Sequence, residues 1–399
     1  MNIVEKYGGS SVATIEKIQA IAKHVKEMKD AGHNIVLVAS AMGKMTNKLI
    51  DMARQVGGED NLRELDMLLA TGEMRSVSLL AMAIQALGVD AISMTGFQAG
   101  FLTSETHSHA RILKIDADKI KAHLAEGKVV VVAGFQGMDE HGDITTLGRG
   151  GSDTTAVALA AVLGYDCHIY TDVYGVYTCD PRRYPKAKRL KEISYAEMMQ
   201  MACLGSGVLE TRSVELASKY NVRLYLGHAL EPDMNKGTFI MQHTKQLEDM
   251  PITGISVKED YAILRVQDLP NDGKFLSQLF DMISALDINL DTISQQLNSD
   301  GSVSFSLYCT KKQSDIILAN IDSLKSSYPI SRLLGFVKLS VIGLGISTHS
   351  GIAAKVLNTL SQNKIRYYMI TSSEISISLT IEESDMNKAI EVLGDAFNL

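Results

Sequence analysis

Residues 34–46 read NIVLVASAMGKMT, an apolar run that passes directly into serine, glycine and threonine. The segment NIVLVA at 34–39 is typical of a strand that is buried on both faces of a parallel sheet. Similar short strand-like runs lie at residues 3–7, 89–94, 128–133 and 168–171. Apolar residues at helical spacing lie between such runs, at 12–28 and 62–87. This alternation predicts an α/β fold with a mostly parallel sheet sandwiched by helices.

Glycine and hydroxyl residues gather where these strands end, which is where open α/β sheets bind their ligands. The segment KYGGSS at 6–11 joins a strand to a helix, and its glycines would let backbone amides approach phosphate oxygens. An ordinary turn with a serine cap explains it equally well. The segment SAMGKMT at 40–46 suits a small polar substrate, or is a plain strand-to-helix loop.

Two later segments carry more specific chemistry. GFQG at 134–137 and TTLGRGGSDTT at 145–155 place one arginine and one aspartate among glycines and hydroxyls, before an apolar helix at 156–163. An arginine there offers a planar fork to a carboxylate or phosphate. YTDVYGVYTCDPR at 170–182 has aromatic, hydroxyl and arginine groups that could hold a nucleotide. The alternative for this last segment is a long surface loop.

Bulk composition excludes several classes of protein. The chain has 399 residues, which predicts two or three domains, and a net charge of −7 without a basic aromatic stripe. We therefore expect no nucleic-acid partner. We also expect no membrane partner, because no apolar run reaches about 18 residues. The four cysteines have no metal-ligand spacing and the chain opens directly on a strand-like run, so we expect no signal peptide and a cytoplasmic protein.

The C-terminal part contains an internal repeat after the polar segment QHTKQLEDMP at 242–251, a candidate linker. Gly273 corresponds to Gly351 and Ile293 to Ile370, and each copy has the order strand, glycine-opened helix, strand, strand, helix. Two βαββαβ units of this size predict small ligand-binding modules. The predicted domains are 1–245, 252–330 and 331–399, and the last two could interleave.

In order along the chain, KYGGSS, SAMGKMT, LLATGE, GFQG, TLGRGGSDTT and YTDVYGVYTCDPR resemble the signature of aspartate kinases, within the amino acid kinase superfamily. The C-terminal repeat is similar to the tandem, ferredoxin-like ACT domains of these enzymes. The resemblance covers nearly the whole chain. No homoserine dehydrogenase part follows, so the chain resembles the monofunctional type. It implies ATP-dependent phosphorylation of the side-chain carboxylate of L-aspartate, the first step of lysine, threonine and methionine biosynthesis.

The resemblance also implies roles for particular residues. Lys6 and Asp153 would be catalytic, with Asp153 orienting Lys6. Arg149 would grip the α-carboxylate of aspartate, which would be surrounded by Ser40, Thr46, Glu73, Arg149 and Ser152. ATP would be bound by Lys6, Tyr7, Gly8, Gly9, Thr171, Asp172, Tyr177 and Arg182. Mg²⁺ would arrive on ATP, with no metal ligand from the protein.

Three positions depart from the family pattern. Tyr7 stands where phenylalanine is common, Tyr174 replaces the usual aspartate of TDVDGVY, and Gly207 in GSGVLETR stands where a nucleotide-contacting lysine often lies. The last two bear on nucleotide affinity rather than on the reaction.

For the regulatory part, the resemblance implies binding of an amino-acid effector and at least a homodimer, or a dimer of dimers, through the ACT domains. The effector would be lysine, threonine or both. It would contact a loop and a strand formed by Asn271, Asp272, Gly273, Lys274, Phe275, Asn289, Asp291, Ser294, Gln295 and Gln296.

Three other readings remain. A sibling kinase could use another carboxylate acceptor such as glutamate, although GRGGSD and the ACT pair speak against it. A non-catalytic sensor of amino acids or nucleotides could keep the fold, although Lys6, Glu73, Arg149 and Asp153 are all present. A dinucleotide-dependent dehydrogenase would need a GxGxxG fingerprint that the sequence lacks.

Overall fold

The structure is a computed structural model, and it describes residues 1–242, 251–286, 288–321, 328 and 330–399. This part of the chain forms two compact units. The first comprises the described residues of Met1–Thr178, Lys188–Cys203 and Gly207–Asp249, and the second comprises those of Cys179–Ala187, Leu204–Ser206 and Met250–Leu399. The candidate linker lies, except for residues 242 and 251, outside the described residues. The domain ranges given above stay a prediction.

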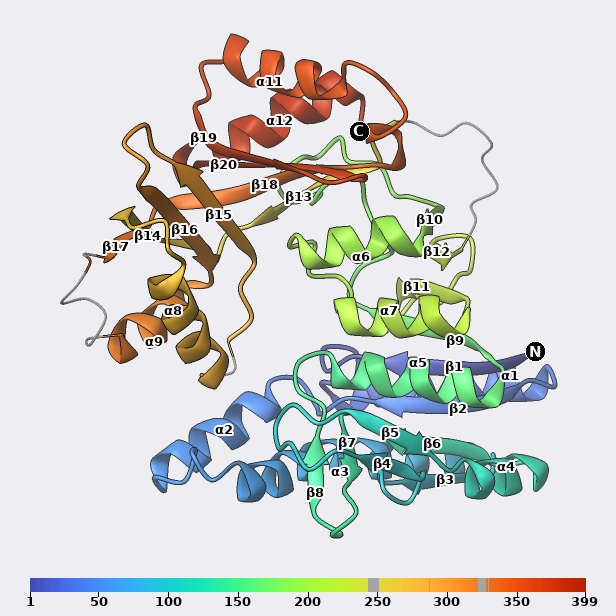
Figure 1. Ribbon diagram of the computed structural model, residues 1–399. Coiled ribbons are helices and arrows are strands. Elements are labelled where there is room, and N and C mark those ends of the chain that lie inside the picture. Colours follow the sequence, from blue (N-terminus) through green and yellow to red (C-terminus); the bar gives the residue numbers. More distant parts are fainter. Residues whose placement is uncertain (243–250, 287, 322–327, 329) are drawn as a thin grey trace. The chain divides into compact units, whose positions relative to one another are not determined.

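The described part of the first unit is built on an eight-stranded sheet with the order β10-β12-β11-β9-β1-β2-β6-β3 (Figure 1). Its strands are β1 (Asn2–Tyr7), β2 (Asn34–Ala39), β3 (Ala91–Met94), β6 (Val129–Ala133), β9 (Asp166–Thr171), β10 (Glu192–Ser194), β11 (Leu224–His228) and β12 (Thr238–Met241). Every pair is parallel except β11 with β12. The predicted mostly parallel sheet is confirmed.

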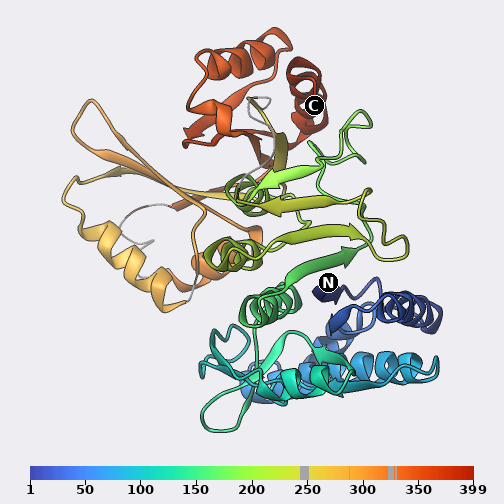
Figure 2. The ribbon, with the colours of Figure 1, turned by 90° about the vertical axis from the view of Figure 1, so that its right-hand side faces the viewer.

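Helices cover both faces of this sheet, which is why β2 and β6 are almost wholly apolar and β1 is buried from Ile3 to Tyr7. On one face, α1 (Ile15–Asp30) and α3 (Leu62–Gln85) share a core with these strands. Figure 2 shows the strands between α1 and the helices of the other face, which are α5 (Gly151–Leu163), α6 (Tyr195–Cys203) and α7 (Thr211–Tyr220). The unit also contains α2 (Met45–Gln55) and α4 (Asp118–Ala125).

Helix α3 is long and apolar enough, by length and composition alone, to cross a membrane, although charged residues interrupt its apolar ones. Half of the most apolar 18-residue stretch of this helix is buried inside the protein. The helix also points two buried carboxylates, Asp66 and Glu73, into the protein interior. These features are those of a core helix.

A smaller sheet that was not predicted has the order β5-β4-β7-β8. Its strands are β4 (Phe101–Thr103), β5 (Ile112–Ile115), β7 (Gln136–Met138) and β8 (Ile144–Thr146). β8 leads directly into the glycine-rich segment that opens α5. The buried carboxylate of Asp66 fixes β8, because it accepts hydrogen bonds from the backbone N–H (2.8 Å) and the hydroxyl (2.6 Å) of Thr146.

The described part of the second unit contains two four-stranded sheets, one for each copy of the repeat. The first copy has the order β15-β16-β14-β17, and the second has β13-β18-β20-β19. The first copy comprises β14 (Ala262–Leu269), α8 (Lys274–Ala285), β15 (Thr292–Leu297), β16 (Val303–Cys309), α9 (Lys311–Asn320) and β17 (Ile330–Leu333). The second comprises β13 (Gly254–Lys258), β18 (Phe336–Ile342), η1 (Leu344–Ile346), α11 (Ile352–Gln362), β19 (Tyr367–Ser372), β20 (Ser376–Glu382), η2 (Glu383–Asp385) and α12 (Met386–Phe397).

The second sheet includes a strand that precedes the first copy in sequence. β13 precedes both copies in sequence, yet it pairs with β18 of the second sheet. It takes the position that β17 takes beside β14 in the first sheet. The predicted order strand, helix, strand, strand, helix is confirmed in each copy.

A short segment that lies in sequence between two stretches of the first unit also belongs to the second unit. The segment Cys179–Ala187 packs against the core of the second copy, in which Cys179 and Tyr184 are buried. The hydroxyl of Tyr184 donates a hydrogen bond to Asp395 (2.8 Å), and Lys186 pairs with the same carboxylate (2.7 Å). A side chain at Gly394 would collide with the Tyr184 ring, so a glycine is required there.

Candidate active site

The candidate site forms where β1, β2 and β6 end, because the carboxyl ends of parallel strands meet at one edge of the sheet. β1 supplies Lys6 near its end, and Ser40 directly follows β2. Helix α5 packs against β1 and β2 and brings Ser152 and Asp153 in its first turn to the same edge. Segments far apart in sequence thus meet at one place.

Lys6 and Asp153 form a close ion pair, with 2.5 Å between Nζ and Oδ1. Both side chains are about nine-tenths buried, at 10% and 11% exposed. A lysine held in this way is a fixed positive charge, since the carboxylate limits its conformations and burial weakens solvent screening. The predicted partnership of these two residues therefore exists in the folded chain.

The glycine-rich segment approaches the rest of the site closely. Gly150 caps α5 in the left-handed region, with φ of 68°, and a side chain there would collide with Glu210. A Cβ at Gly134 would lie 2.7 Å from the hydroxyl of Ser152. The first N–H groups of α5, which have no partner within the helix, consequently open on this edge and favour an anion.

Glu73 reaches the same place from α3. Its Oε1 accepts a hydrogen bond from the backbone N–H of Ala41 (3.0 Å), and a side chain at Gly72 would collide with the Ala41 methyl group. Its Oε2 is buried and has no hydrogen-bond partner among the described residues. Burial raises the pKa of Glu73 to about 7, and the bond from Ala41 opposes this shift. A buried carboxylate oxygen without a partner is costly, which indicates a ligand that donates to it.

The loop after β1 and the loop after β2 pack on one another beside Lys6. The N–H of Gly43 donates to the carbonyl of Gly9 (2.9 Å), and a Cβ at Gly9 would lie 2.8 Å from the carbonyl oxygen of Ala41. A Cβ at Gly8 would lie 3.5 Å from the ammonium of Lys6. The absent side chain leaves room for an anionic group next to this ammonium, so the loop fits nucleotide phosphates.

These side chains line one cavity of about 230 Å³, the active-site pocket. All seven residues predicted to be catalytic or to bind substrate line it: Lys6, Ser40, Thr46, Glu73, Arg149, Ser152 and Asp153. Sequence reasoning did not single out Phe135, which also lines the pocket and has an unusual positive φ of 71°. Glu210 was missed as well. Burial raises the pKa of Glu210, and Arg149 opposes this shift.

The predicted nucleotide residues are more dispersed. The ring of Tyr7 is buried in the core on the α1 face, where it stacks on Tyr170 and donates to Glu5, so its side chain does not line the pocket. Thr171 ends β9, Asp172 is exposed and Tyr177 lies further along the same loop. Arg182 lies in the segment that belongs to the second unit, where it pairs with Asp180 (2.8 Å).

The two departures from the family pattern have different surroundings. Tyr174 stacks on His228, with 4.7 Å between ring centroids, and the neighbouring Glu231 raises the pKa of its hydroxyl. Tyr174 follows β9, which neighbours β1, and His228 is the last residue of β11, the next strand beyond β9. Gly207 has a φ of 65° and open space around it.

The predicted effector residues lie on the first copy of the repeat. Gly273 opens α8 with a φ of 69°, and Asp272 accepts a hydrogen bond from the N–H of Lys274 (3.0 Å). Phe275 is buried in the core of the copy. Side chains of the edge strand β15 are mostly exposed, among them the predicted Gln295 and Gln296, with Ser294 half-buried. Elsewhere in the set, Asn289 accepts from Gln313, and Asp291 is bound by two lysines.

Comparison with known proteins identifies the family. Residues 1–228 match the amino acid kinase family and residues 339–397 match an ACT domain. Over its whole length the chain is 44% identical to an aspartokinase of Bacillus sp. (strain MGA3), of which 97% is covered. It is 42% identical to aspartokinase 2 of Bacillus subtilis (strain 168), of which 98% is covered. The chain belongs to the aspartate kinase family.

Solved aspartate kinases share its fold. Escherichia coli aspartokinase III in complex with aspartate and ADP, in the R-state, superimposes with a TM-score of 0.84 at 23% identity, with all of both chains covered. The same enzyme with lysine and aspartate, in the T-state, gives 0.76 at 23% identity over 99% of each chain. At this identity the likeness concerns the fold alone. The aspartate kinase of Synechocystis gives 0.56 at 36% identity, covering all of this chain and 69% of that one.

Proposed function

We propose that this member of the aspartate kinase family transfers the γ-phosphate of ATP to the side-chain carboxylate of L-aspartate, giving 4-phospho-L-aspartate. The observation that carries the proposal is the active-site pocket. It combines a lysine–aspartate pair, an arginine, and a buried carboxylate with a free oxygen in one cavity. Full-length similarity to curated aspartokinases supports the same substrate.

The charges of the pocket suit a small amino acid with two carboxylates. Arg149 offers paired N–H donors to the α-carboxylate. We assign the α-ammonium to Glu73, because its buried Oε2 lacks a donor among the described residues. The hydroxyls of Ser40, Thr46 and Ser152 complete the wall around the substrate.

The chemical problem is repulsion between two anions. The side chain of aspartate has a pKa near 3.9, so the nucleophile is already ionised at neutral pH and needs no general base. Lys6, fixed by Asp153, would stabilise the negative charge that develops on the transferring phosphoryl group. The loop of Gly8 and Gly9 and the start of α5 would align donor and acceptor. We expect direct transfer without a phosphoenzyme.

The proposal includes a nucleotide site. Phosphates would lie against Gly8 and Gly9, and Thr171, Asp172, Tyr177 and Arg182 would contact the rest of ATP. A pocket with one lysine-paired aspartate and several hydroxyls fits a Mg²⁺ ion that keeps phosphate and water ligands. When bound, Mg²⁺ would neutralise part of the phosphate charge.

Regulation and assembly belong to the same proposal. We propose that lysine, threonine or both inhibit the enzyme by binding to the first copy of the repeat, and that the chain forms a homodimer or a dimer of dimers. The edge strands β15 and β19 support the dimer, since both expose apolar side chains, Ile293 on one and Ile370 on the other. A cytoplasmic location is a further part of the proposal.

The test is release of ADP from ATP and Mg²⁺ with aspartate, glutamate or no acceptor, each with and without lysine and threonine. Of the three acceptor conditions, we expect ADP only with aspartate. The rate should be lower when at least one of the two effectors is present. ADP formed with glutamate would assign the chain to a sibling activity. Binding of aspartate and ATP without ADP would favour the sensor, and an activity that no aspartate-derived amino acid changes would overturn the regulatory part.

A further inference from the structure

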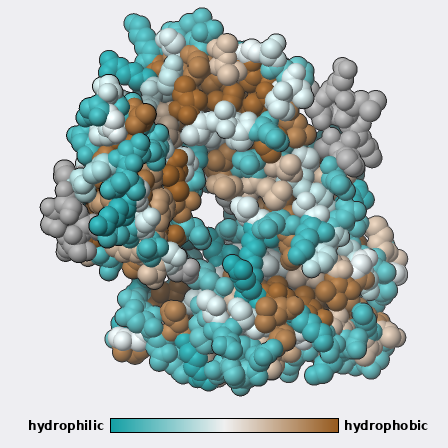
Figure 3. Space-filling view, in the orientation of Figure 1, coloured by the Kyte–Doolittle hydropathy of each residue, from teal (hydrophilic) through white to brown (hydrophobic). Residues whose placement is uncertain are grey.

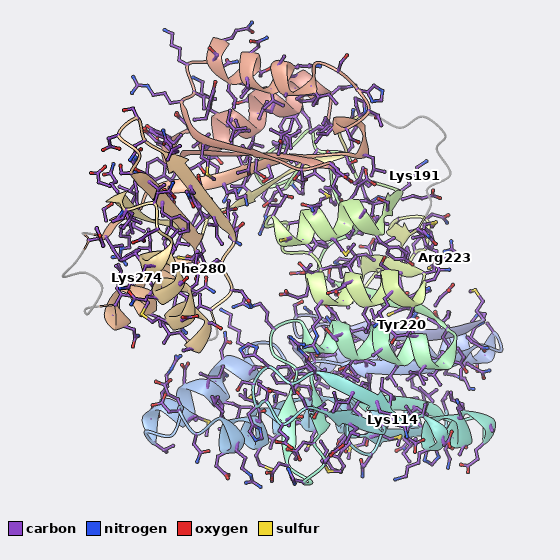
Figure 4. All side chains as sticks on the ribbon, viewed as in Figure 1. Lys114, Lys191, Tyr220, Arg223, Lys274 and Phe280 are labelled. Carbon is purple, nitrogen blue, oxygen red and sulfur yellow. The ribbon has the colours of Figure 1, made fainter. Side chains whose placement is uncertain are left out.

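A second hollow lies on the first unit, between β5, α5 and α7, with a volume of about 850 Å³. It shares no lining residue with the active-site pocket. Figure 3 shows apolar residues on this face of the molecule, over α5 and β5. In Figure 4, Lys114 of β5 and Tyr220 at the end of α7 lie on either side of α5. We call this hollow the basic groove.

Positive charge dominates the basic groove. Its lining includes Arg111, Lys114, Arg212 and Lys219 against the carboxylate of Glu215. Among the described residues, no carboxylate lies within 4.0 Å of the nitrogens of these four side chains. Burial and the neighbouring Arg111 lower the pKa of Arg212. Cations gathered in this way on a chain of net charge −7 indicate an anionic ligand.

The floor of the groove is apolar. Ala158, Ala161 and Val162 of α5 line it, with Val162 43% exposed. Leu113 of β5 and Tyr220 are 59% and 55% exposed, and the ammonium of Lys219 lies 5.5 Å from the centre of the Tyr220 ring. Apolar concavities of about 300–1,000 Å³ with a few placed polar groups are the usual form of small-molecule sites.

We propose that the basic groove binds a small organic anion with an aromatic or other flat apolar body, such as an aromatic carboxylate, sulfonate or phosphate ester. The anionic group would lie among Arg111, Lys114 and Arg212, and the apolar body would cover the alanines of α5 beside Tyr220. This site goes beyond the proposed kinase reaction. The groove does not suit a second copy of the chain, because a two-fold contact sets the same patch against itself and would oppose two basic rims.

The groove lies directly behind the loop that carries Arg149. The guanidinium of Arg212 donates hydrogen bonds to the carbonyl of Leu147 (2.9 Å) and to that of Ala110 (3.0 Å). Thr154, which also lines the groove, donates to the carbonyl of Gly150 (3.2 Å). A ligand in the groove is therefore one layer of backbone away from the active-site pocket without entering it.

The test uses the full chain with saturating ADP, Mg²⁺ and aspartate, and the fluorescent probe 8-anilinonaphthalene-1-sulfonate. We expect saturable binding of about one dye per chain. The uncharged N-phenyl-1-naphthylamine should bind about tenfold more weakly or worse, because it lacks the anion. Equal binding of the two dyes, or displacement of the sulfonate by raising ADP, would overturn the proposal.

Two variants locate the dye. The double charge reversal Arg111→Glu, Lys114→Glu removes the cations, and Ala161→Trp fills the floor while leaving the charges unchanged. Each should weaken binding of the sulfonate by about tenfold or more, whereas Lys121→Glu on α4, an exposed lysine outside the groove, should not. Thermal unfolding checks that each variant is folded. Unchanged dye affinity in both groove variants overturns the site. A groove variant that binds the dye normally but has a changed sedimentation coefficient also overturns it, because that result would assign the face to contact with a second copy.

Discussion

Lysine and aspartate form a cluster in the described part of each unit. In the first unit, Lys6 of β1 faces Asp153 of α5. In the second, Asp291 is bound by Lys338 at Oδ1 (2.7 Å) and by Lys258 at Oδ2 (2.8 Å). Both lysines of the second cluster lie on the second sheet, whereas Asp291 precedes β15 of the first. That cluster joins the two copies of the repeat.

The two clusters differ in what they leave free. Lys6 and Asp153 line a cavity, so their charges can act on a bound ligand. Both oxygens of Asp291 are occupied, and Lys338 also donates to the hydroxyl of Thr292 (3.1 Å). An effector that used Asp291 would compete with these two lysines for the carboxylate oxygens. The same residue types thus form a pair that lines a cavity in one unit and a structural link between the two copies of the repeat in the other.

Removing Lys6 should produce the largest effect. Lys6→Ala takes the fixed positive charge from the transferring phosphoryl group, so we expect kcat to fall roughly 10³-fold or more. Binding of aspartate should change little, because Arg149 and Glu73 remain. Steady-state kinetics and aspartate titration measure both quantities.

The matched variant for this experiment is Asp153→Asn, which keeps Lys6 but releases it. It should lower kcat less than Lys6→Ala does. If Lys6→Ala instead weakened aspartate binding and left kcat normal, Lys6 would be a binding residue and the contrast between the clusters would fail.

Removing Asp291 should act on stability rather than on turnover. Asp291→Asn leaves two lysines without their counter-charge, which we expect to lower the free energy of unfolding of the second unit by roughly 3 kcal/mol. The two lysines hold the pKa of Asp291 below its ordinary value, despite burial. The difference from the unchanged chain should therefore be complete at neutral pH and disappear as the pH falls below about 4.

Urea unfolding at pH 7 and pH 3 measures this difference, and Lys338→Met combined with Asp291→Leu is the control. That pair replaces the two more deeply buried ions with apolar side chains and leaves only Lys258, which is partly exposed to solvent, so it should recover much of the stability. Unchanged stability together with loss of feedback inhibition would identify Asp291 as an effector residue after all.

The variant Glu73→Gln tests whether Glu73 binds the ammonium group of aspartate. Glu73→Gln should raise KM for aspartate about tenfold to a hundredfold, the value of a hydrogen bond to a charged group. Because the pKa of Glu73 is about 7, the unchanged enzyme should lose affinity for aspartate as the pH falls from 8 to 6, when the carboxylate becomes protonated. The variant should lack this trend.

KM measured from pH 6 to 9 decides the matter. Glu64→Gln is the matched control, since it makes the same change on the exposed side of α3. A flat pH profile of the unchanged enzyme would contradict the assigned role of Glu73.

The smallest effects should separate the two copies of the repeat. Gly273 and Gly351 open α8 and α11 with φ of 69° and 89°, and an added Cβ would meet nothing within 4 Å at either site. Each Gly→Ala change should cost about 1 kcal/mol of stability. Only Gly273→Ala should raise the concentration of inhibitor needed for half-inhibition, by about fivefold. Equal shifts in both variants would show that the copies bind effector alike.

Much of the first unit could be predicted because its signals are local. The run at 34–39 is β2 within the same bounds, and the helix predicted at 62–87 is α3 at Leu62–Gln85. The seven predicted pocket residues come together for a simple reason. Parallel strands deliver their ends to one edge, so motifs that follow different strands must converge there.

What could not be predicted depends on contacts between distant segments. The place of β13 in the second sheet follows from pairing with β18, about eighty residues away. Glu210 lies near Arg149 only because α7 packs on α5. The ring of Tyr7 was assigned to the nucleotide from its motif, but strand alternation turns it to the core, opposite to Lys6.

The segment Cys179–Ala187 has a practical consequence for anyone who divides this gene. Cutting the chain at the polar stretch near residue 245 would separate Tyr184 from Asp395 and leave its apolar contacts without a partner. The N-terminal fragment would carry a loop with exposed apolar side chains, and the C-terminal fragment would lose part of its hydrophobic core. The sequence can be cut there, but the fold cannot.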